Sequence, residues 1–175
     1  MKVSILAAVS LDGFIARTHH DGKINWTSEQ DKNWLHKKTR QAGFVIMGHN
    51  TYRTLSEPLT QRTNIVLTRH PAKQPAMPRT EYTNDSPQII LDKLAQRGAK
   101  EVIIFGGEQI FQLFLSAKLV NIMWLTMAPA ILGGGIKFPY AAIAGNTKLL
   151  SSRELDKGEL LLELAISNKP KNQTT

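Results

Sequence analysis

Short apolar runs alternate with helical segments along most of the chain, and this alternation restricts the folds that it can adopt. Several runs end at a glycine before a helix begins, which is typical of a strand followed by a turn. Strands separated by helices favour a parallel sheet, because a parallel connection must cross from one end of the sheet to the other. We therefore predict an α/β fold, a mainly parallel central sheet with helices on both faces. The expected strands are 3–9, 14–16, 44–47, 64–68, 102–105 and 120–127, and the expected helices are 28–42, 50–55, 87–97 and a segment that begins after Gly107.

The C-terminal part of the chain has a different pattern. The apolar segments 149–155 and 159–166 flank Asp156-Lys157-Gly158, which has the residue types of a hairpin turn. We predict that they form a C-terminal antiparallel hairpin at the edge of the sheet. No repeat or linker divides the chain, so we predict one domain over 1–167 and a disordered tail over 168–175.

The composition excludes several classes of protein. Hydrophobic residues make up 42% of the 175 residues, which is typical of a chain with a core. The absence of cysteine excludes a disulfide framework and a thiolate zinc site. The most apolar stretch, 119–132, contains Asn121 and Pro129 and is shorter than the about 20 residues of a membrane span. The apolar run after Lys2 is interpreted as a strand rather than a signal peptide, so we expect a cytoplasmic protein without a membrane partner.

Positive charge is concentrated in one segment. The chain has 22 Lys and Arg against 14 Asp and Glu, a net charge of +8, and between residues 32 and 79 Glu57 is the single acid. Such a segment fits a phosphorylated ligand or a polyanion, and it also fits an ordinary solvated surface. A basic nucleic-acid-binding protein is therefore an alternative of another class. It would need stacking aromatic side chains, which this segment largely lacks, so we predict no nucleic-acid partner.

The turn Phe105-Gly106-Gly107-Glu108 is the clearest candidate site. Glycines allow the backbone to approach a ligand closely, and the N-terminus of the following helix offers N–H groups to a phosphate. A second strand-to-helix turn lies at Gly48, within the basic segment. Each turn alone is equally typical of a tight structural connection. Together they favour a phosphorylated dinucleotide, bound at the carboxyl ends of the strands.

Asp31 is the best candidate for an ionisable group in a pocket. It precedes Trp34 and Leu35 by three and four residues, so it shares their apolar helix face. A carboxylate on that face needs a partner, such as the N–H groups of a ligand. The alternative is an ordinary acid in the first helical turn, and spacing alone slightly favours it. Asp12 is interpreted as a turn residue, and the five histidines show no spacing for a metal site.

Several segments resemble two related groups of enzymes. The segments 45–52, 62–69 and 102–111 resemble dihydrofolate reductases. The segments 10–16 (Ser-Leu-Asp-Gly-Phe-Ile-Ala) and 128–135 (Ala-Pro-Ala-Ile-Leu-Gly-Gly-Gly) resemble the reductase domain of riboflavin biosynthesis, the C-terminal part of a bifunctional deaminase-reductase. The two groups share the dihydrofolate reductase-like fold, and the resemblance implies an NADPH-dependent reductase.

The resemblance also implies where the cofactor would bind. Gly106 and Gly107 match a glycine pair that is joined by a cis bond and holds the cofactor diphosphate. Arg69 matches a position that meets the adenosine 2′-phosphate, whereas His49 stands where dihydrofolate reductases usually have Arg or Lys. The positions expected to line the NADPH site are Ala8, Ile15, Gly48, His49, Asn50, Thr51, Leu67, Thr68, Arg69, Phe105, Gly106, Gly107, Glu108, Gln109 and Ile110.

On the substrate side, Asp31 matches the acid that binds the pterin ring of dihydrofolate and aids its protonation. Thr126 matches a threonine behind that acid, and Arg62 matches the arginine that binds the glutamate tail of folate. The segment 17–26 matches a mobile loop that closes over the site. The positions expected to contact substrate are Ala8, Trp26, Asp31, Trp34, Leu35, Arg62 and Thr126, with Asp31 as the catalytic residue.

From these features we predict hydride transfer from NADPH to a small nitrogen heterocycle. The substrate placed first is the ribosylaminopyrimidine of the riboflavin pathway, 5-amino-6-(5-phosphoribosylamino)uracil. Dihydrofolate is the alternative, because the residues that match around Asp31 are those of dihydrofolate reductases. Another pteridine or heterocycle stays open as substrate, as does a non-catalytic relative that keeps only the dinucleotide site. The riboflavin-type relatives also imply a homodimer, and no metal is expected.

Overall fold

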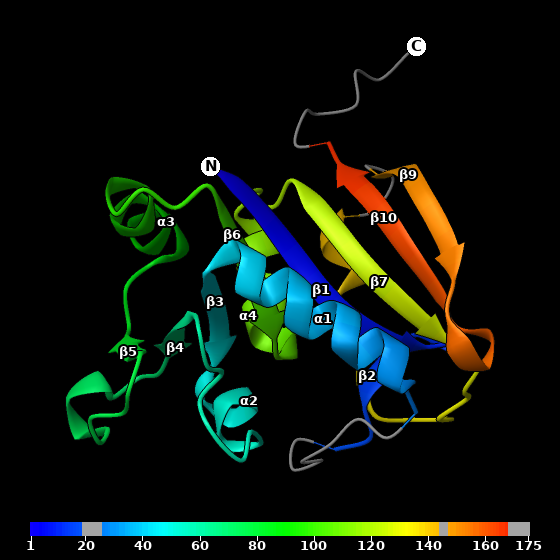
Figure 1. Cartoon of the computed structure of the whole chain (residues 1–175), viewed down its shortest axis with the longest axis horizontal. Helices are drawn as coiled ribbons and strands as arrows, with labels where there is room; N and C mark the ends of the chain where they lie inside the picture. Colours follow the sequence, from blue (N-terminus) through cyan, green and yellow to red (C-terminus); the bar gives the residue numbers. More distant parts are fainter. Residues whose placement is uncertain (19–25, 144–146, 168–175) are drawn as a thin grey trace.

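The structure is a computed structural model that describes residues 1–18, 26–143 and 147–167. One eight-stranded sheet forms its centre, with the strand order β5-β4-β3-β6-β1-β7-β10-β9 (Figure 1). Neighbouring strands from β5 to β7 run parallel, whereas β10 and β9 are antiparallel to their neighbours. The strands of this sheet are β1 (Lys2–Ser10), β3 (Phe44–Gly48), β4 (Thr63–Leu67), β5 (Thr80–Thr83), β6 (Glu101–Gly106), β7 (Ile122–Ala128), β9 (Thr147–Glu154) and β10 (Leu160–Ile166). The predicted α/β fold and the C-terminal hairpin are confirmed.

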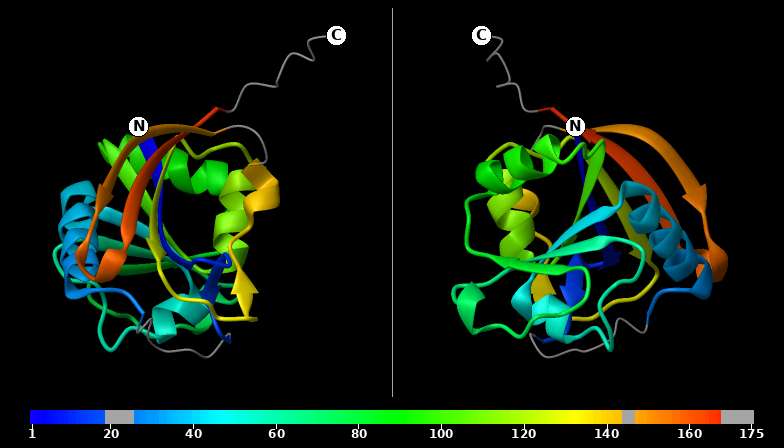
Figure 2. Two further views of the ribbon diagram at one scale, coloured as in Figure 1. Left: turned by 90° about the vertical axis from the view of Figure 1, so that its right-hand side faces the viewer. Right: turned by 60° about the vertical axis from the view of Figure 1, so that its left-hand side comes forward.

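Helices cover both faces of the sheet, as Figure 2 shows from two further directions. Trp34 and Leu35 of α1 pack on the face that carries Leu6 and Val45, and Phe111 and Phe114 of α4 pack on the opposite face. The helices are α1 (Glu29–Ala42), α2 (His49–Arg53), α3 (Pro87–Gln96) and α4 (Glu108–Ser116), with short 3-10 turns η1 (Pro71–Lys73), η2 (Tyr140–Ile143) and η3 (Asp156–Gly158). No described helix is long and apolar enough to cross a membrane.

Two short strands were not anticipated from the sequence. β5 pairs with β4 at the far edge of the sheet, and its residues are polar, so hydrophobic periodicity gives no signal for it. β8 (Ile136–Lys137) pairs with β2 (Phe14–Ala16) in a separate two-stranded sheet. The predicted tail 168–175 lies outside the described residues, as does most of the predicted closing loop 17–26.

The first strand is fastened to the loop that follows β7 by one side chain, Asp12. Its carboxylate accepts hydrogen bonds from the backbone N–H groups of Leu132 and Gly133, at 3.1 and 2.8 Å, and from the Ser10 hydroxyl at 2.6 Å. The hydrogen bond from Ser10, followed by those from the backbone, lowers the pKa of Asp12 from 3.8 to about 2. The turn residue predicted at this position therefore joins two segments that are far apart in the sequence.

Replacement of Asp12 by Asn should lower the thermal stability of the protein. Because the folded-state pKa is depressed, the carboxylate stabilises the fold above pH 3.8, and this contribution is lost as the pH falls toward about 2. Melting curves of both proteins at several pH values check this, with Asp92→Asn on the exposed side of α3 as a control. A melting-temperature difference that stays constant across that pH window would contradict the role of the charge.

Candidate functional site

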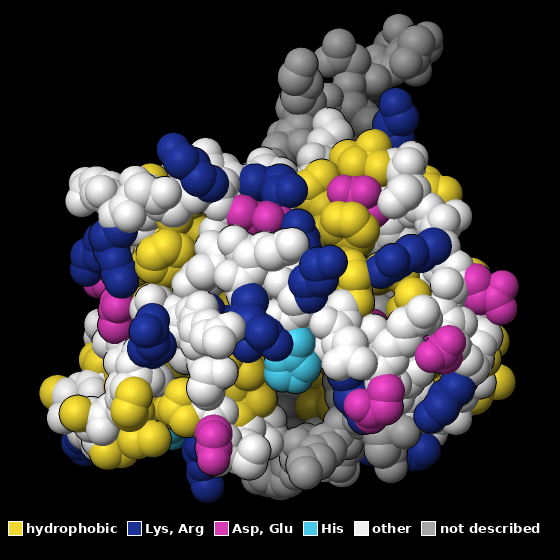
Figure 3. Space-filling model, in the orientation of Figure 1, with side chains coloured by type: hydrophobic (Ala, Val, Ile, Leu, Met, Phe, Trp, Pro, Cys, Tyr) yellow, Lys and Arg dark blue, Asp and Glu magenta, His cyan; other side chains and the backbone are white. Residues whose placement is uncertain are grey.

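A crevice opens at the carboxyl ends of β1 and β6. The two strands pair only as far as Ile5 and Ile104, whereas β1 continues along β7 until Ser10 pairs with Ala128. The helix that follows β1, α1, lies on one face of the sheet, and the helix that follows β6, α4, lies on the other. Ligands of open α/β sheets bind where successive connections leave toward opposite faces. Figure 3 shows the surface hollowed in this region, between α1 and α2.

The two glycine turns predicted from the sequence lie side by side at this crevice. β3 and β6 are neighbours, and Met47 pairs with Gly106. A Cβ atom at Gly107 would lie 3.0 Å from Oγ1 of Thr51, and one at Gly48 would lie 3.0 Å from Cγ1 of Ile110. The turns therefore pack so closely that side chains at these glycines would have to displace a neighbour.

The backbone at the Gly106–Gly107 turn has the form expected from the resemblance. The peptide bond between the two glycines is cis, and Gly107 is the N-cap residue of α4. No side chain of the described residues caps this helix, so N–H groups of its first turn can meet an anion. The turn thus has the features of a phosphate-binding cradle, formed by backbone groups rather than by charged side chains.

The other predicted cofactor positions lie around these turns. His49 begins α2 and packs edge-on against Tyr82 of β5, with 6.5 Å between ring centroids. Burial raises the pKa of Tyr82 to about 12, so this phenol is neutral at physiological pH. The Thr68 N–H donates to the Thr83 carbonyl at 2.9 Å, and Arg69, the next residue, is exposed. Arg69 is therefore accessible to an anionic ligand just beyond the end of β4.

Asp31 is the buried acid of the site. It lies in the first turn of α1 with 3% of its surface exposed, and its Oδ1 accepts a hydrogen bond of 2.5 Å from the Thr126 hydroxyl. Burial raises its pKa above the usual value, and the negative charge of Glu159 acts in the same direction. Hydrogen bonds from Thr126 and Thr27 oppose this rise only in part. Asp31 therefore faces inward, unlike the ordinary acid of the first helical turn that spacing alone slightly favoured.

The start of α1 is capped by residues from two parts of the chain. Ser28 is the N-cap residue, and its hydroxyl oxygen accepts a hydrogen bond from the Asp31 N–H at 3.1 Å. In a capping box the side chain of the third helical residue, here Asp31, would return a bond to the Ser28 N–H. That bond is instead accepted by Glu159, at 2.6 Å, from the turn before β10. The sequence analysis missed Glu159, because no local pattern links it to α1.

The remaining predicted substrate positions fall into two groups. Ala8 pairs with Thr126 across β1 and β7, which places it beside the buried acid. The indole N–H of Trp26 is buried and has no hydrogen-bond partner among the described residues. Trp34 instead packs on Trp124, with 5.2 Å between ring centroids, and Leu35 packs with the core residues beneath α1. Trp34 and Leu35 thus support the helix on the sheet.

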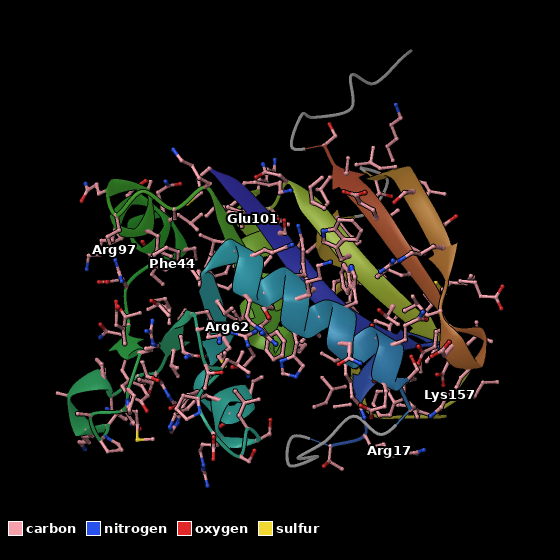
Figure 4. All side chains as sticks on the ribbon, in the orientation of Figure 1. Arg17, Phe44, Arg62, Arg97, Glu101 and Lys157 are labelled. Atoms are coloured by element: carbon pink, nitrogen blue, oxygen red, sulfur yellow. The ribbon has the colours of Figure 1, made fainter. Side chains whose placement is uncertain are left out.

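Arg62 does not join the group around Asp31. It is buried beneath α1 (Figure 4), where Nε donates to the Thr60 carbonyl at 2.8 Å and the guanidinium donates to the Thr39 hydroxyl. Thr39 follows Asp31 by eight residues, which is about 12 Å along a helix. Burial lowers the pKa of Arg62, though an arginine stays charged at any physiological pH. Within the described ranges, no cluster of His, Asp and Glu is placed to hold a metal ion.

Comparisons with known proteins agree with this architecture. Residues 2–157 match the family model described as "Dihydrofolate reductase". The chain belongs to the dihydrofolate reductase family. Members of this family are NADPH-dependent oxidoreductases.

Individual relatives are distant. The chain is 27% identical over 156 residues to the uncharacterized protein YwjB of Bacillus subtilis, covering 85% of this chain and 87% of that protein. It is 26% identical over 139 residues to the dihydrofolate reductase of Haemophilus influenzae, covering 79% of each.

Solved structures show the same fold. A putative riboflavin biosynthesis protein from Shewanella sp. PV-4 is 20% identical and has a TM-score of 0.76, covering 95% of this chain and 99% of that one. A deaminase and 5-amino-6-(5-phosphoribosylamino)uracil reductase from Thermotoga maritima is 19% identical, with a TM-score of 0.78 over 95% of this chain and 56% of that chain. At these identities the similarity shows the fold alone.

Replacement of Asp31 by Asn should stabilise the protein near neutral pH. Because burial raises the pKa of Asp31 in the folded state, ionisation costs stability as the pH rises above the unfolded value. Asparagine keeps the oxygen that accepts from Thr126 and has no charge to bury. We expect its melting temperature to exceed that of the wild type near neutral pH by about 2–4 °C, the effect of about 1 kcal/mol in a chain of this size.

A control variant, Glu29→Gln, should change the stability in the opposite direction. The exposed Glu29 bonds to Lys32, which lowers the pKa of Glu29, so Glu29→Gln should lose stability near neutral pH. If Asp31→Asn were no more stable than the wild type across the whole pH range, burial would not dominate the energetics of this acid.

Proposed function

We propose that the chain is an NADPH-dependent reductase that transfers a hydride to a small nitrogen heterocycle. The observation that carries this proposal is the position of the buried Asp31–Thr126 pair beside Ala8, at the same edge of the sheet as the paired glycine turns. One part of the crevice offers a buried acid whose pKa is raised, and the other offers backbone N–H groups at the start of α4. A reductase of a C=N bond needs both a proton source and a held cofactor.

The cofactor would be held by the glycine turns and the residues around them. The first turn of α4 would bind the diphosphate, Gly48 and Thr51 would border it, and Arg69 would meet the 2′-phosphate. When bound there, NADPH supplies the hydride. A side chain at Gly48 or Gly107 would have to displace Ile110 or Thr51, so glycine at both positions keeps the two turns close together.

Asp31 would bind and protonate the heterocycle. A carboxyl group with a raised pKa retains a proton at higher pH, and this proton can pass to the ring nitrogen directly or through water. Thr126 and Thr27 hold the Asp31 carboxyl in place, and the acceptor positions that remain on it would face a ring N–H or amino group. The indole N–H of Trp26, which has no partner among the described residues, is a further donor for substrate or water.

Of the two substrate classes, we place the ribosylaminopyrimidine first. Dihydrofolate would need Arg62 to bind its carboxylate tail, but the guanidinium is buried and already donates to Thr39 and Thr60. Dihydrofolate stays the alternative, because the Asp31–Thr126 pair suits a pterin ring equally well.

The homodimer expected from the sequence stays a prediction, which sedimentation of the purified protein checks.

The charges on the basic surface argue against the nucleic-acid alternative. Lys38 pairs with Glu101 at 3.1 Å and Lys32 pairs with Glu29 at 2.5 Å, so part of the positive charge along α1 is neutralised within the fold. Figure 3 shows acidic side chains among the basic ones on this face. A strongly salt-dependent binding of unrelated oligonucleotides would be needed to restore this alternative.

The decisive assay measures NADPH oxidation by the purified protein with each of the two substrates. We expect turnover with the ribosylaminopyrimidine, and an Asp31→Asn variant that loses about a hundredfold in kcat while its affinity for NADPH is unchanged. Glu29→Gln, an exposed acid of the same helical turn, is the matched control and should keep full turnover. Turnover with neither substrate, or an undiminished Asp31→Asn variant, would refute the proposed reaction.

The cradle is tested by adding one methyl group. In Gly107→Ala the new Cβ lies 3.0 Å from the Thr51 hydroxyl, so the turn must open and its N–H groups shift. We expect NADPH to bind about tenfold more weakly, a change of about 1.4 kcal/mol. Gly134→Ala, where a Cβ has nothing within 4 Å, should bind as the wild type does. Equal affinities of the two variants, measured by quenching of tryptophan fluorescence, would place the cofactor elsewhere.

A further inference from the structure

The carboxylate of Glu159 is buried where few acids would be tolerated. It has 0% of its surface exposed and lies between η3 and β10, at the N-terminus of α1. Its Oε1 accepts from the Ser28 N–H and its Oε2 accepts from the Ser28 hydroxyl, both at 2.6 Å. A buried carboxylate is costly unless it is hydrogen-bonded, and both oxygens are. The N-terminal end of a helix also favours negative charge.

One of these bonds, from the Ser28 N–H, replaces a bond that the Asp31 side chain would otherwise accept. Asp31 stands at the position from which a capping box returns its bond to the Ser28 N–H. Because Glu159 already accepts that bond, the Asp31 carboxyl is free to turn toward Thr126. Only the backbone N–H of Asp31 takes part in the cap, through the Ser28 hydroxyl oxygen at 3.1 Å.

Glu159 also places a like charge beside the acid. The groups that act on the Asp31 carboxyl are the hydroxyls of Thr126 on β7 and Thr27, the ammonium of Lys32 on α1, and Glu159. Among these, Glu159 alone favours the protonated form, in the same direction as burial. Figure 4 shows Lys157, two residues before Glu159, at the turn that meets the start of α1.

We propose that Glu159 is a positioning residue for Asp31, which accepts the return bond of the helix cap and so leaves the Asp31 carboxyl free for substrate, next to a like charge. This role rests on the proposed function, because it matters only where Asp31 must carry a proton. It differs from a purely structural cap, since a neutral acceptor would fix the helix equally well without favouring the protonated acid.

Two substitutions separate the two parts of the proposal. Glu159→Gln keeps an oxygen that accepts from the Ser28 N–H and removes the charge, so the pKa of Asp31 should fall below its wild-type value. Glu159→Ala also removes the acceptor, so Asp31 should turn to the Ser28 N–H and its pKa should fall further. Carboxyl-carbon NMR titration of labelled aspartate in the unliganded protein measures both shifts. Glu154→Gln removes an equal charge from an exposed site of the same hairpin and should leave the titration of Asp31 unchanged.

The same variants have a kinetic signature. As the pH rises through the pKa of Asp31, kcat/KM should decline, and in Glu159→Gln this decline should move to lower pH while KM for NADPH stays constant. An Asp31 titration that is identical in the wild type and Glu159→Gln, or shifted equally by Glu154→Gln, would overturn the proposal. If Glu159→Ala does not fold, Glu159→Gln alone still tests the proposal. Failure of the proposed function would give a different result. The wild type would then show no turnover, while the titration of Asp31 would still differ between the wild type and Glu159→Gln.

Discussion

The crevice depends on where β1 and β6 cease to pair. Beyond Ile5 and Ile104 the two strands separate, and β1 keeps its register only with β7. The separation is stable because helices α1 and α4 hold opposite faces of the sheet, each packed on its own group of buried side chains. On the side toward β6, the alanines of β1 then border an opening, and the glycine pair at the end of β6 borders the same opening. Every residue to which we assign a functional role, except Arg69, lies in or beside this opening or holds a residue that does.

Two different kinds of group border the crevice, and they need different environments. The cradle at Gly106 and Gly107 consists of backbone N–H groups, so it tolerates no side chain and depends on close packing. Asp31 depends on burial, on a hydrogen bond from Thr126 of β7 and on the nearby charge of Glu159 in the hairpin. The hairpin therefore does more than extend the sheet, because its turn supplies the carboxylate that completes the cap of α1.

The order of strands and helices could be predicted from the sequence because each buried run is followed by a turn signal. The same signals located the glycine turns. The spacing of Asp31 with Trp34 and Leu35 made it a candidate for the buried face of α1, although spacing alone slightly favoured an ordinary acid of the first helical turn. β5 could not be found, since its polar residues form a strand only because β4 offers an unpaired edge. Glu159 could not be linked to Ser28, because their contact joins residues 131 positions apart. Such contacts arise from topology, which local patterns do not encode.

A dinucleotide held by the glycine turns next to Asp31 would change the backbone amide NMR signals of the isotope-labelled protein during titration with NADPH. We expect the largest shifts at Gly48, Thr51 and the first turn of α4, with smaller shifts at Asp31 and Thr126. Shifts confined to the exposed basic side of α1, around Lys37 and Arg40, would contradict it and would identify a site for anions in general.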